Sequence, residues 1–199
     1  SEESSMTRAC VRADGFFAPL RMTLSRIFIH RGGVIGALLS LAAGPLAAAE
    51  SPLAGPWRFD AKRSTELSPW QDYTLTLGVE GDRVTLARQL GAGRRGFADT
   101  MTLDVSRPDN VVPVTMWPDN RHLGAYISGD RTKHVRAAWL DGGRILRLST
   151  DLVLSTQQGD RAVNILSDYK VSANGAVLTL TELRSTRNRP VVYVFHRAP

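Results

Sequence analysis

Apolar and polar residues alternate with a period of two along most of the chain from Trp57 onward. Because successive side chains of a strand point to opposite faces, this period predicts half-buried antiparallel strands. Val, Ile, Thr and aromatic residues fill the runs, as a pleated surface prefers. The apolar positions of the clearest runs are Leu75, Leu77 and Val79; Val84, Leu86 and Leu90; Met101, Leu103 and Val105; Leu146 and Leu148; Val163 and Ile165; Leu178 and Leu180; and Val191, Tyr193 and Phe195.

Turn residues separate these runs where tight hairpins are needed. Glu80-Gly81-Asp82, Asp141-Gly142-Gly143 and Asn174-Gly175 each lie between two apolar alternations and can supply the positive φ of a tight turn. The spacing predicts about nine or ten strands in a meander, which must close into a barrel or split into two sheets because an open edge invites aggregation. We therefore expect an all-β fold, a single antiparallel meander barrel of about 8–10 strands, with a sandwich as the alternative.

Two stretches interrupt the alternation. Residues 60–72 carry polar residues and a proline, and we expect them to form a long loop over one mouth of the barrel. Pro108, Pro113 and Pro118 mark the second stretch. Since proline has no backbone N–H to give to a ladder, Pro113 predicts an edge strand or a bulge.

Residues 22–49 have the organisation of a signal peptide. Two arginines precede an apolar run over 34–43, and Ala47-Ala48-Ala49 then supplies the small residues of a cleavage site. The run is too short to span a bilayer comfortably. We expect residues 1–49 to be a leader cleaved after Ala49, with translation starting at Met22 or Met6, and residues 50–199 to form the barrel domain.

The composition indicates in which cellular compartment the protein acts and which classes of partner it binds. Residues 50–199 contain no cysteine, since Cys10 precedes them, and they hold 20 Lys and Arg against 16 Asp and Glu. Export without disulfides is typical of a bacterial periplasmic or secreted protein whose core needs no staple. The charges alternate in sign and form no basic stripe with stacking aromatics, so we expect no nucleic-acid partner. We also expect no stable membrane insertion.

Both ends of the predicted barrel carry residues that point to a family. Gly55-Pro56-Trp57 heads the first strand, and Val194-Phe195-His196-Arg197 ends the last one. Together they resemble the lipocalin or calycin superfamily, and the resemblance implies that Trp57 packs beneath Arg197 to close one end of a small secreted bacterial barrel. Physically, a guanidinium stacked on an indole stays partly solvated while it covers apolar surface. The alternative leaves Trp57 as an ordinary core residue and Arg197 as a terminal charge.

Motifs for metals, cofactors and catalysis are weak. His122, His134 and His196 match no compact metal spacing. The G-x-G-x-x-G spacing of residues 91–96 lies between two strands and opens no helix, so it predicts a hairpin loop and not a dinucleotide site. His134 and Arg136 share one strand face, which lines the lumen or faces solvent. We assign no catalytic residue, no metal and no cofactor.

Several polar residues share the strand face of apolar neighbours and therefore point toward the lumen. Such a charge must be paired or must serve a ligand, because an isolated buried charge costs several kcal/mol. One interpretation places Arg88 or Arg161 against an anionic headgroup and uses Tyr169 to orient it. The alternative places these residues at solvated strand ends. The candidate ligand-binding residues are Arg88, Asp99, Arg161, Tyr169 and Glu182.

The favoured function is binding of a small, largely apolar or amphipathic molecule, with or without an anionic end, inside the barrel. A filled barrel that acts as an interaction scaffold is the first alternative, and inward-pointing Met101, Trp139, Tyr193 and Phe195 would favour it. An enzyme that uses the same cavity is the less favoured alternative. Fold does not decide among these roles, and the oligomeric state is left open.

Overall fold

The computed structural model describes residues 50–199 apart from 68, 115 and 118–125. These residues belong to the compact unit Ala47–Pro199. The predicted leader, Pro118 and His122 lie outside the described residues. No helix of the described part is long and apolar enough to cross a bilayer.

Eleven antiparallel strands and two short 3-10 helices make up the described part of the chain. The strands are β1 Gly55–Phe59, β2 Asp72–Glu80, β3 Arg83–Ala92, β4 Arg95–Asp104, β5 Asn110–Pro113, β6 Tyr126–Ile127, β7 Thr132–Leu140, β8 Ile145–Thr156, β9 Gly159–Val171, β10 Val177–Arg184 and β11 Val191–Arg197. The helices are η1 Ala61–Arg63 and η2 Asp141–Gly143.

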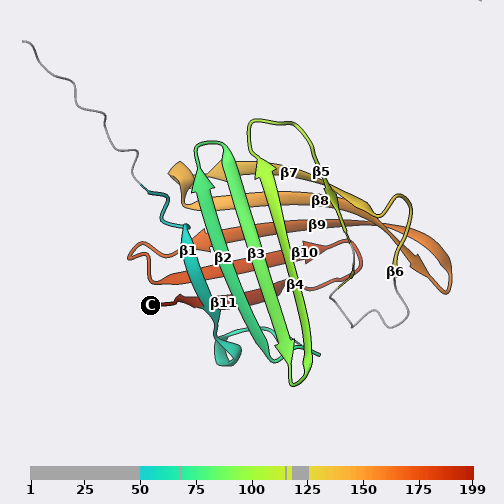
Figure 1. Ribbon diagram of the computed structural model, residues 1–199, viewed down its shortest axis with the longest axis horizontal. Helices are drawn as coiled ribbons and strands as arrows, with labels where there is room; N and C mark the ends of the chain where they lie inside the picture. Colours follow the sequence, from blue (N-terminus) through green and yellow to red (C-terminus); the bar gives the residue numbers. More distant parts are fainter. Residues whose placement is uncertain (1–49, 68, 115, 118–125) are drawn as a thin grey trace, which may run out of the picture. The chain divides into compact units, whose positions relative to one another are not determined.

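All strands belong to one sheet in the order β4-β3-β2-β1-β11-β10-β9-β8-β7-β5, with β6 paired to β8. The first strand pairs with the last, so β1 joins the β2–β4 meander to the β7–β11 meander. Figure 1 shows β1–β4 crossing in front of β7–β10, so that the sheet folds over on itself. The predicted all-β meander barrel is confirmed, with short strands β5 and β6 added to the expected number.

The barrel has a seam where β4 meets β5 and β7. Within the described residues, no backbone ladder joins β4 to either strand. The buried side chain of Asn110 bridges the seam instead. Its Oδ1 accepts a hydrogen bond from the Asp104 N–H at 2.8 Å, and its Nδ2 donates to the Asp104 and Val135 carbonyls at 3.1 Å each. The Asn110 side chain thus connects the strands on the two sides of the seam by hydrogen bonds, in place of backbone pairing.

The three predicted turns lie between paired strands, and Gly81, Gly142 and Gly175 all adopt positive φ. The G-x-G-x-x-G segment is the β3–β4 hairpin, as expected. Pro113 ends β5, which lies at the end of the strand order, so the predicted edge position is confirmed.

Residues 60–72 only partly match the predicted loop over a mouth. Their first half runs beside β11, where the Asp60 N–H donates to the Val194 carbonyl at 2.8 Å and the Thr65 N–H donates to the Val192 carbonyl at 2.7 Å. These bonds continue the pairing of β1 after that strand ends. The second half packs on the core through buried Leu67 and through Trp70.

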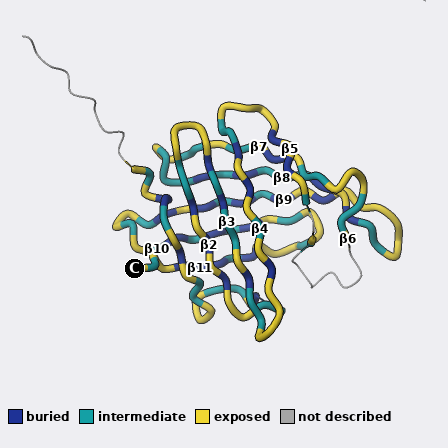
Figure 2. The backbone as a smooth tube through the Cα atoms, in the orientation of Figure 1, coloured by how far each residue is buried: buried dark blue, intermediate teal, exposed yellow. Residues whose placement is uncertain are grey.

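Side chains of one face of every long strand fill the interior, and Figure 2 shows buried and exposed positions alternating along β2, β3 and β4. Toward the β2–β3 and β9–β10 turns this interior is closely packed and apolar, and we refer to this region as the filled half. Its members, each at most 2% exposed, include Leu53, Trp57, Leu75, Leu77, Val84, Leu86, Leu103, Leu146, Val171, Leu178 and Phe195.

Candidate functional site

The filled half is closed by the residues that the sequence singled out. The Arg197 guanidinium lies 4.4 Å from the centroid of the Trp57 ring. It also donates to the backbone carbonyls of Ala54 at 2.8 Å, Pro52 at 2.6 Å and Gly175 at 3.1 Å. Gly55 has φ +115°, and a Cβ there would stand 2.9 Å from Arg197 Nη1. The predicted stacking of Arg197 on Trp57 is therefore present. Gly55 allows it, because a side chain at that position would clash with the guanidinium.

Polarity changes along the same strands toward the opposite end. On β3, Val84 and Leu86 are followed on the inner face by Arg88. On β10, Leu178 and Leu180 are followed by Glu182. The strands that build the apolar core thus carry charged side chains at the next inward-facing position toward the other end of the barrel.

These polar side chains surround a cavity of about 110 Å³, and we refer to this region as the hollow half. Its apolar wall comes from β4, β5, β8, β9 and the residues after β5. The described residues that line it are Arg88, Phe97, Asp99, Thr100, Met101, Val112, Pro113, Val114, Met116, Trp117, Lys133, Leu148, Thr150, Leu152, Ile165, Ser167, Tyr169, Glu182 and Arg184.

Arg88 and Asp99 face each other across the β3–β4 hairpin. Arg88 Nε and Nη2 donate to the two Asp99 carboxylate oxygens at 2.8 and 2.5 Å, and the side chains are 19% and 25% exposed. Burial by itself lowers the pKa of Arg88, but the Asp99 carboxylate outweighs it and the net pKa is raised. Arg88 is therefore a paired cation on the cavity wall, and a role for it in meeting a ligand headgroup stays a prediction.

Glu182 and Arg184 form a second ion pair on β10, with side chains 12% and 8% exposed. The Arg184 guanidinium also lies 5.8 Å from the centroid of the Trp117 ring. Burial lowers the pKa of Arg184 below its usual value. Glu182 is buried and lines the cavity, and its charge is matched by Arg184 two residues away.

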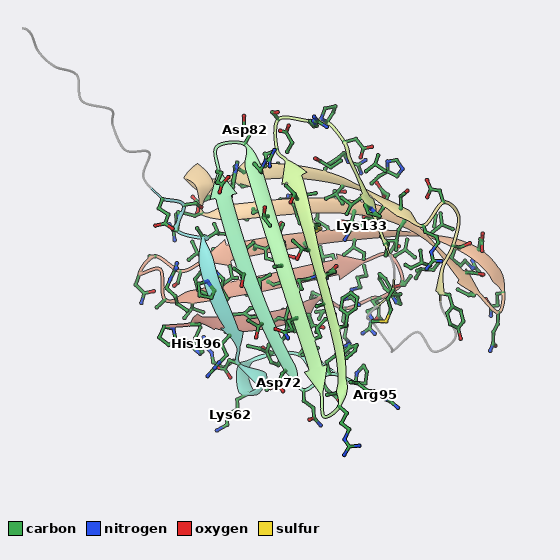
Figure 3. The ribbon with its side chains drawn as sticks, viewed as in Figure 1. Lys62, Asp72, Asp82, Arg95, Lys133 and His196 are labelled. Carbon is green, nitrogen blue, oxygen red and sulfur yellow. The ribbon has the colours of Figure 1, made fainter. Side chains whose placement is uncertain are left out.

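Lys133 differs from these pairs. It lies on β7 opposite Val112 of β5 and Leu152 of β8, and Figure 3 labels it. Its amine makes no hydrogen bond or ion pair with any residue in the described part of the chain. Burial, and next the positive charge of Arg88, lower its pKa from 10.5 to about 8. Lys133 is thus a cation without a contact partner on the cavity wall.

Neutral polar groups complete the lining. Tyr169 is buried on β9, and burial raises the pKa of its hydroxyl well above the usual value, so it keeps its proton at neutral pH. Ser167 and Thr150 lie nearby on β9 and β8. The prediction that Tyr169 lines the lumen agrees with this placement.

Arg161 does not lie where its alternation with Val163 and Ile165 would place it. Arg161 is exposed near the β8–β9 turn, and it donates to the Gln158 side chain at 3.1 Å. It does not line the cavity, because β8 and β9 extend beyond the part of the barrel that encloses it (Figure 1). His134 and Arg136 also face outward, where they pair with Asp109 and Asp151 at 2.7 Å each.

The described histidines and carboxylates were compared with the arrangements that bind metal ions. Among the described residues, no group of three or more His, Cys, Asp or Glu side chains has a metal-binding arrangement. His196 lies 2.9 Å from Asp60 on the outside, and this contact lowers the pKa of the Asp60 carboxyl.

Sequence reasoning missed Lys133, Arg184 and Trp117. A signal for Lys133 was present, because it shares strand parity with the apolar positions Val135 and Ala137. Arg184 continues the inner face of Glu182 in the same way. No alternation pattern could have identified Trp117, because it lies in the connection after β5 and not in a strand.

The inward-pointing large side chains named for a filled barrel are also present. Tyr193 and Phe195 are buried, and they pack edge to face with Phe59 at centroid distances of 5.9 Å each. Trp139 packs against the core, while Met101 is buried and lines the cavity. Tyr193, Phe195 and Trp139 thus fill the interior beside a cavity that Met101 helps to line.

Comparison with models of known protein families finds no match, and neither does comparison with curated protein sequences. Similar solved structures include a secretory abundant heat soluble protein from Ramazzottius varieornatus, at 11% identity and TM-score 0.46, with coverage of 74% of this chain and 96% of that one. Secretory abundant heat soluble protein 4 from the same organism has 10% identity and TM-score 0.47, covering 75% and 96%. A fatty-acid-binding protein from Manduca sexta has 14% identity and TM-score 0.39, covering 73% and 99%. These distant similarities assign no ligand, and the fold rests on the strand order described above.

Proposed function

We propose that the hollow half binds a small, largely apolar molecule with one anionic end, and that Lys133 receives that end. The observation that carries the proposal is an amine that, within the described residues, has no hydrogen-bond or ion-pair partner and lies on a wall with many apolar side chains. An isolated cation in such a place is costly, and a ligand carboxylate would supply the missing charge and the missing hydrogen bonds.

The charges around the cavity support a singly charged ligand. Arg88 pairs with Asp99, and Glu182 pairs with Arg184, so each of these pairs is close to neutral. Lys133 then leaves the lining with one net positive charge while its amine is protonated. A second anionic group on the ligand would be buried without a matching charge, which is costly.

The volume limits the ligand's size. A buried water needs about 10–15 Å³ of such volume, so the cavity has room for about seven to eleven waters, or a ligand on the order of ten non-hydrogen atoms. Medium-chain carboxylates meet both requirements. Binding by a barrel of this kind would agree with the lipocalin-like resemblance, which we propose as the relationship of this chain.

The experiment compares three probes with one chain and different ends: octanoate, octan-1-ol and octylamine, titrated calorimetrically at pH 7. A charge-assisted hydrogen bond contributes about 1.5–3 kcal/mol, so octanoate should bind about ten- to a hundredfold more tightly than octanol. Octylamine should bind most weakly, because its ammonium would meet Lys133.

Two variants make this test specific. Lys133→Met should reduce octanoate binding to the level of octanol and leave octanol unchanged. Lys170→Met is the matched control, because Lys170 is exposed on the outer face of β9. Equal affinity for octanoate and octanol in the unaltered protein would overturn the proposal. Failure of both to bind would favour the filled interaction barrel.

We also propose that residues 1–49 are removed after Ala49 and that the barrel acts in the bacterial periplasm or outside the cell. The support is the order of basic, apolar and small residues in 22–49. Intact mass of the protein from an exporting host tests this, and retention of residues 22–49 would contradict it.

A further inference from the structure

We propose that Lys133 also captures small apolar aldehydes reversibly as an imine, so that the hollow half is a carbonyl-binding site as well as an anion-binding one. The inference uses the cavity of the proposed function but asks for a different property of the lysine. An anion site needs a positive charge at this position, whereas imine formation needs a primary amine that can reach a bound carbonyl.

The position of the amine supports this chemistry. Lys133 lies between Val112 and Leu152 on neighbouring strands and lines a cavity that can hold an apolar chain. Most lysines hold their ammonium in water or in an ion pair, where the nitrogen lone pair is unavailable to a carbonyl. Lys133 is half-buried and forms no ion pair within the described residues, and the Arg88 cation on β3 opposes its protonation.

The charged groups around Lys133 set how much neutral amine is present. Burial and Arg88 lower its pKa to about 8, while Asp99 and Glu182 act in the opposite direction. About a tenth of such an amine is neutral at pH 7, against roughly one part in a few thousand for an ordinary exposed lysine. Nucleophilicity falls somewhat with pKa, so the advantage in rate is smaller than this ratio.

The reaction needs no reagent beyond the aldehyde. The Nζ lone pair adds to the carbonyl carbon, and the proton released by nitrogen is taken up at oxygen to give a carbinolamine. Loss of that hydroxyl with the second nitrogen proton gives the C=N bond and one water. Tyr169 also lines the cavity and keeps its hydroxyl proton at neutral pH, so it is a donor available to the carbonyl oxygen.

The chain offers good internal controls, because it contains three lysines, Lys62, Lys133 and Lys170, and the other two are exposed. The protein is incubated at pH 7 with octanal and cyanoborohydride, which traps an imine as an octyl-amine, and the sites are located by peptide mapping. We expect Lys133 to be trapped about ten- to a hundredfold faster than Lys62 or Lys170.

Two further measurements separate a cavity reaction from surface chemistry. Excess octanoate should protect Lys133 and leave the slower trapping at the exposed Lys62 and Lys170 unchanged. Lys133→Arg has no primary amine at this position, so it should lose the trapping there, whereas Lys62→Arg, the matched control, should leave trapping at Lys133 unchanged. Equal trapping at all three lysines, or trapping at Lys133 that octanoate does not slow, would overturn the inference. If octanoate still binds in a Lys133-dependent way, that failure leaves the proposed function standing.

Discussion

The filled half and the hollow half of this barrel are built from the same strands and differ in what those strands place inside. β3 contributes Leu86 to the first and Arg88 to the second, and β10 contributes Leu180 and then Glu182. The filled half is closed by Arg197 on Trp57. The hollow half contains two ion pairs and an amine that has no contact partner in the described chain.

The two halves therefore differ in what their side chains contribute to the stability of the barrel. Close apolar packing contributes most of the stability of a small domain, and buried charges generally reduce it. A barrel that is firmly closed at one end can therefore keep a costly polar cavity at the other. The comparison predicts that equal substitutions will have unequal effects in the two halves.

The largest contrast is expected between two leucine truncations. Leu86→Ala should lower the free energy of unfolding by about 3–4 kcal/mol, because it opens a void in close packing. Leu152 lines the existing cavity, so Leu152→Ala should cost about 1–2 kcal/mol. Urea unfolding of both variants measures this, and equal losses would show that the halves are packed alike.

The closure of the filled half gives the next effect. Arg197→Ala removes three hydrogen bonds to backbone carbonyls and the contact with Trp57, and it should cost about 2 kcal/mol. Arg161→Ala is the matched control, since that arginine is exposed and bonds to Gln158, and it should change stability by less than about 0.5 kcal/mol. If the two arginines prove equivalent in thermal unfolding, the closure does not stabilise the barrel.

In the hollow half, removal of the unpartnered charge should stabilise the fold. Lys133→Met should raise the free energy of unfolding at pH 7 by about 1–2 kcal/mol. The pKa of Lys133 is about 8 in the folded chain, against 10.5 for a solvated lysine, so between these pH values the unfolded chain binds more protons and stability rises with pH.

The advantage of Lys133→Met should thus be full below pH 8 and shrink to nothing by about pH 10.5. Unfolding curves of both proteins across this range provide the measurement. A difference that is constant with pH would mean that the substitution acts through packing alone.

The smallest effect concerns the paired charges. Asp99→Asn leaves Arg88 without its carboxylate partner and adds an uncompensated cation to the cavity. Affinity for octanoate should rise about three- to tenfold, or about 1 kcal/mol. Unchanged or weaker binding in calorimetry would indicate that the ligand's anionic end lies far from Arg88.

Much of the fold could be predicted from the two-residue alternation of apolar and polar positions and from the turn sequences. The β2–β3, β7–β8 and β9–β10 hairpins follow from alternation on either side of Gly81, Gly142 and Gly175. The place of Arg197 over Trp57 followed from the family resemblance. These features depend on neighbours in sequence or on a known pairing of chain ends.

The cavity was harder to predict. The alternation of residues along a strand indicates which face of the sheet a side chain lies on, but it does not indicate how far along the barrel axis that side chain lies. Arg161 and Tyr169 share a face of β9, yet Arg161 lies beyond the cavity and Tyr169 within it. Arg88 has the predicted direction, but its neutralisation by Asp99 depends on the register of the β3–β4 hairpin. The importance of Lys133 appears only once β5 and β8 are placed on either side of it.

The most direct test of the central claim is the titration of Lys133 itself. In protein labelled with ¹³C-lysine, the three lysines give separate side-chain signals that can be followed from pH 6 to pH 11 with and without octanoate. We predict that the pKa of Lys133 is about 8 in the free protein and rises when octanoate is bound, while the signals of Lys62 and Lys170 are unaffected by octanoate. A Lys133 that titrates as an ordinary exposed lysine and does not respond to octanoate would contradict the account.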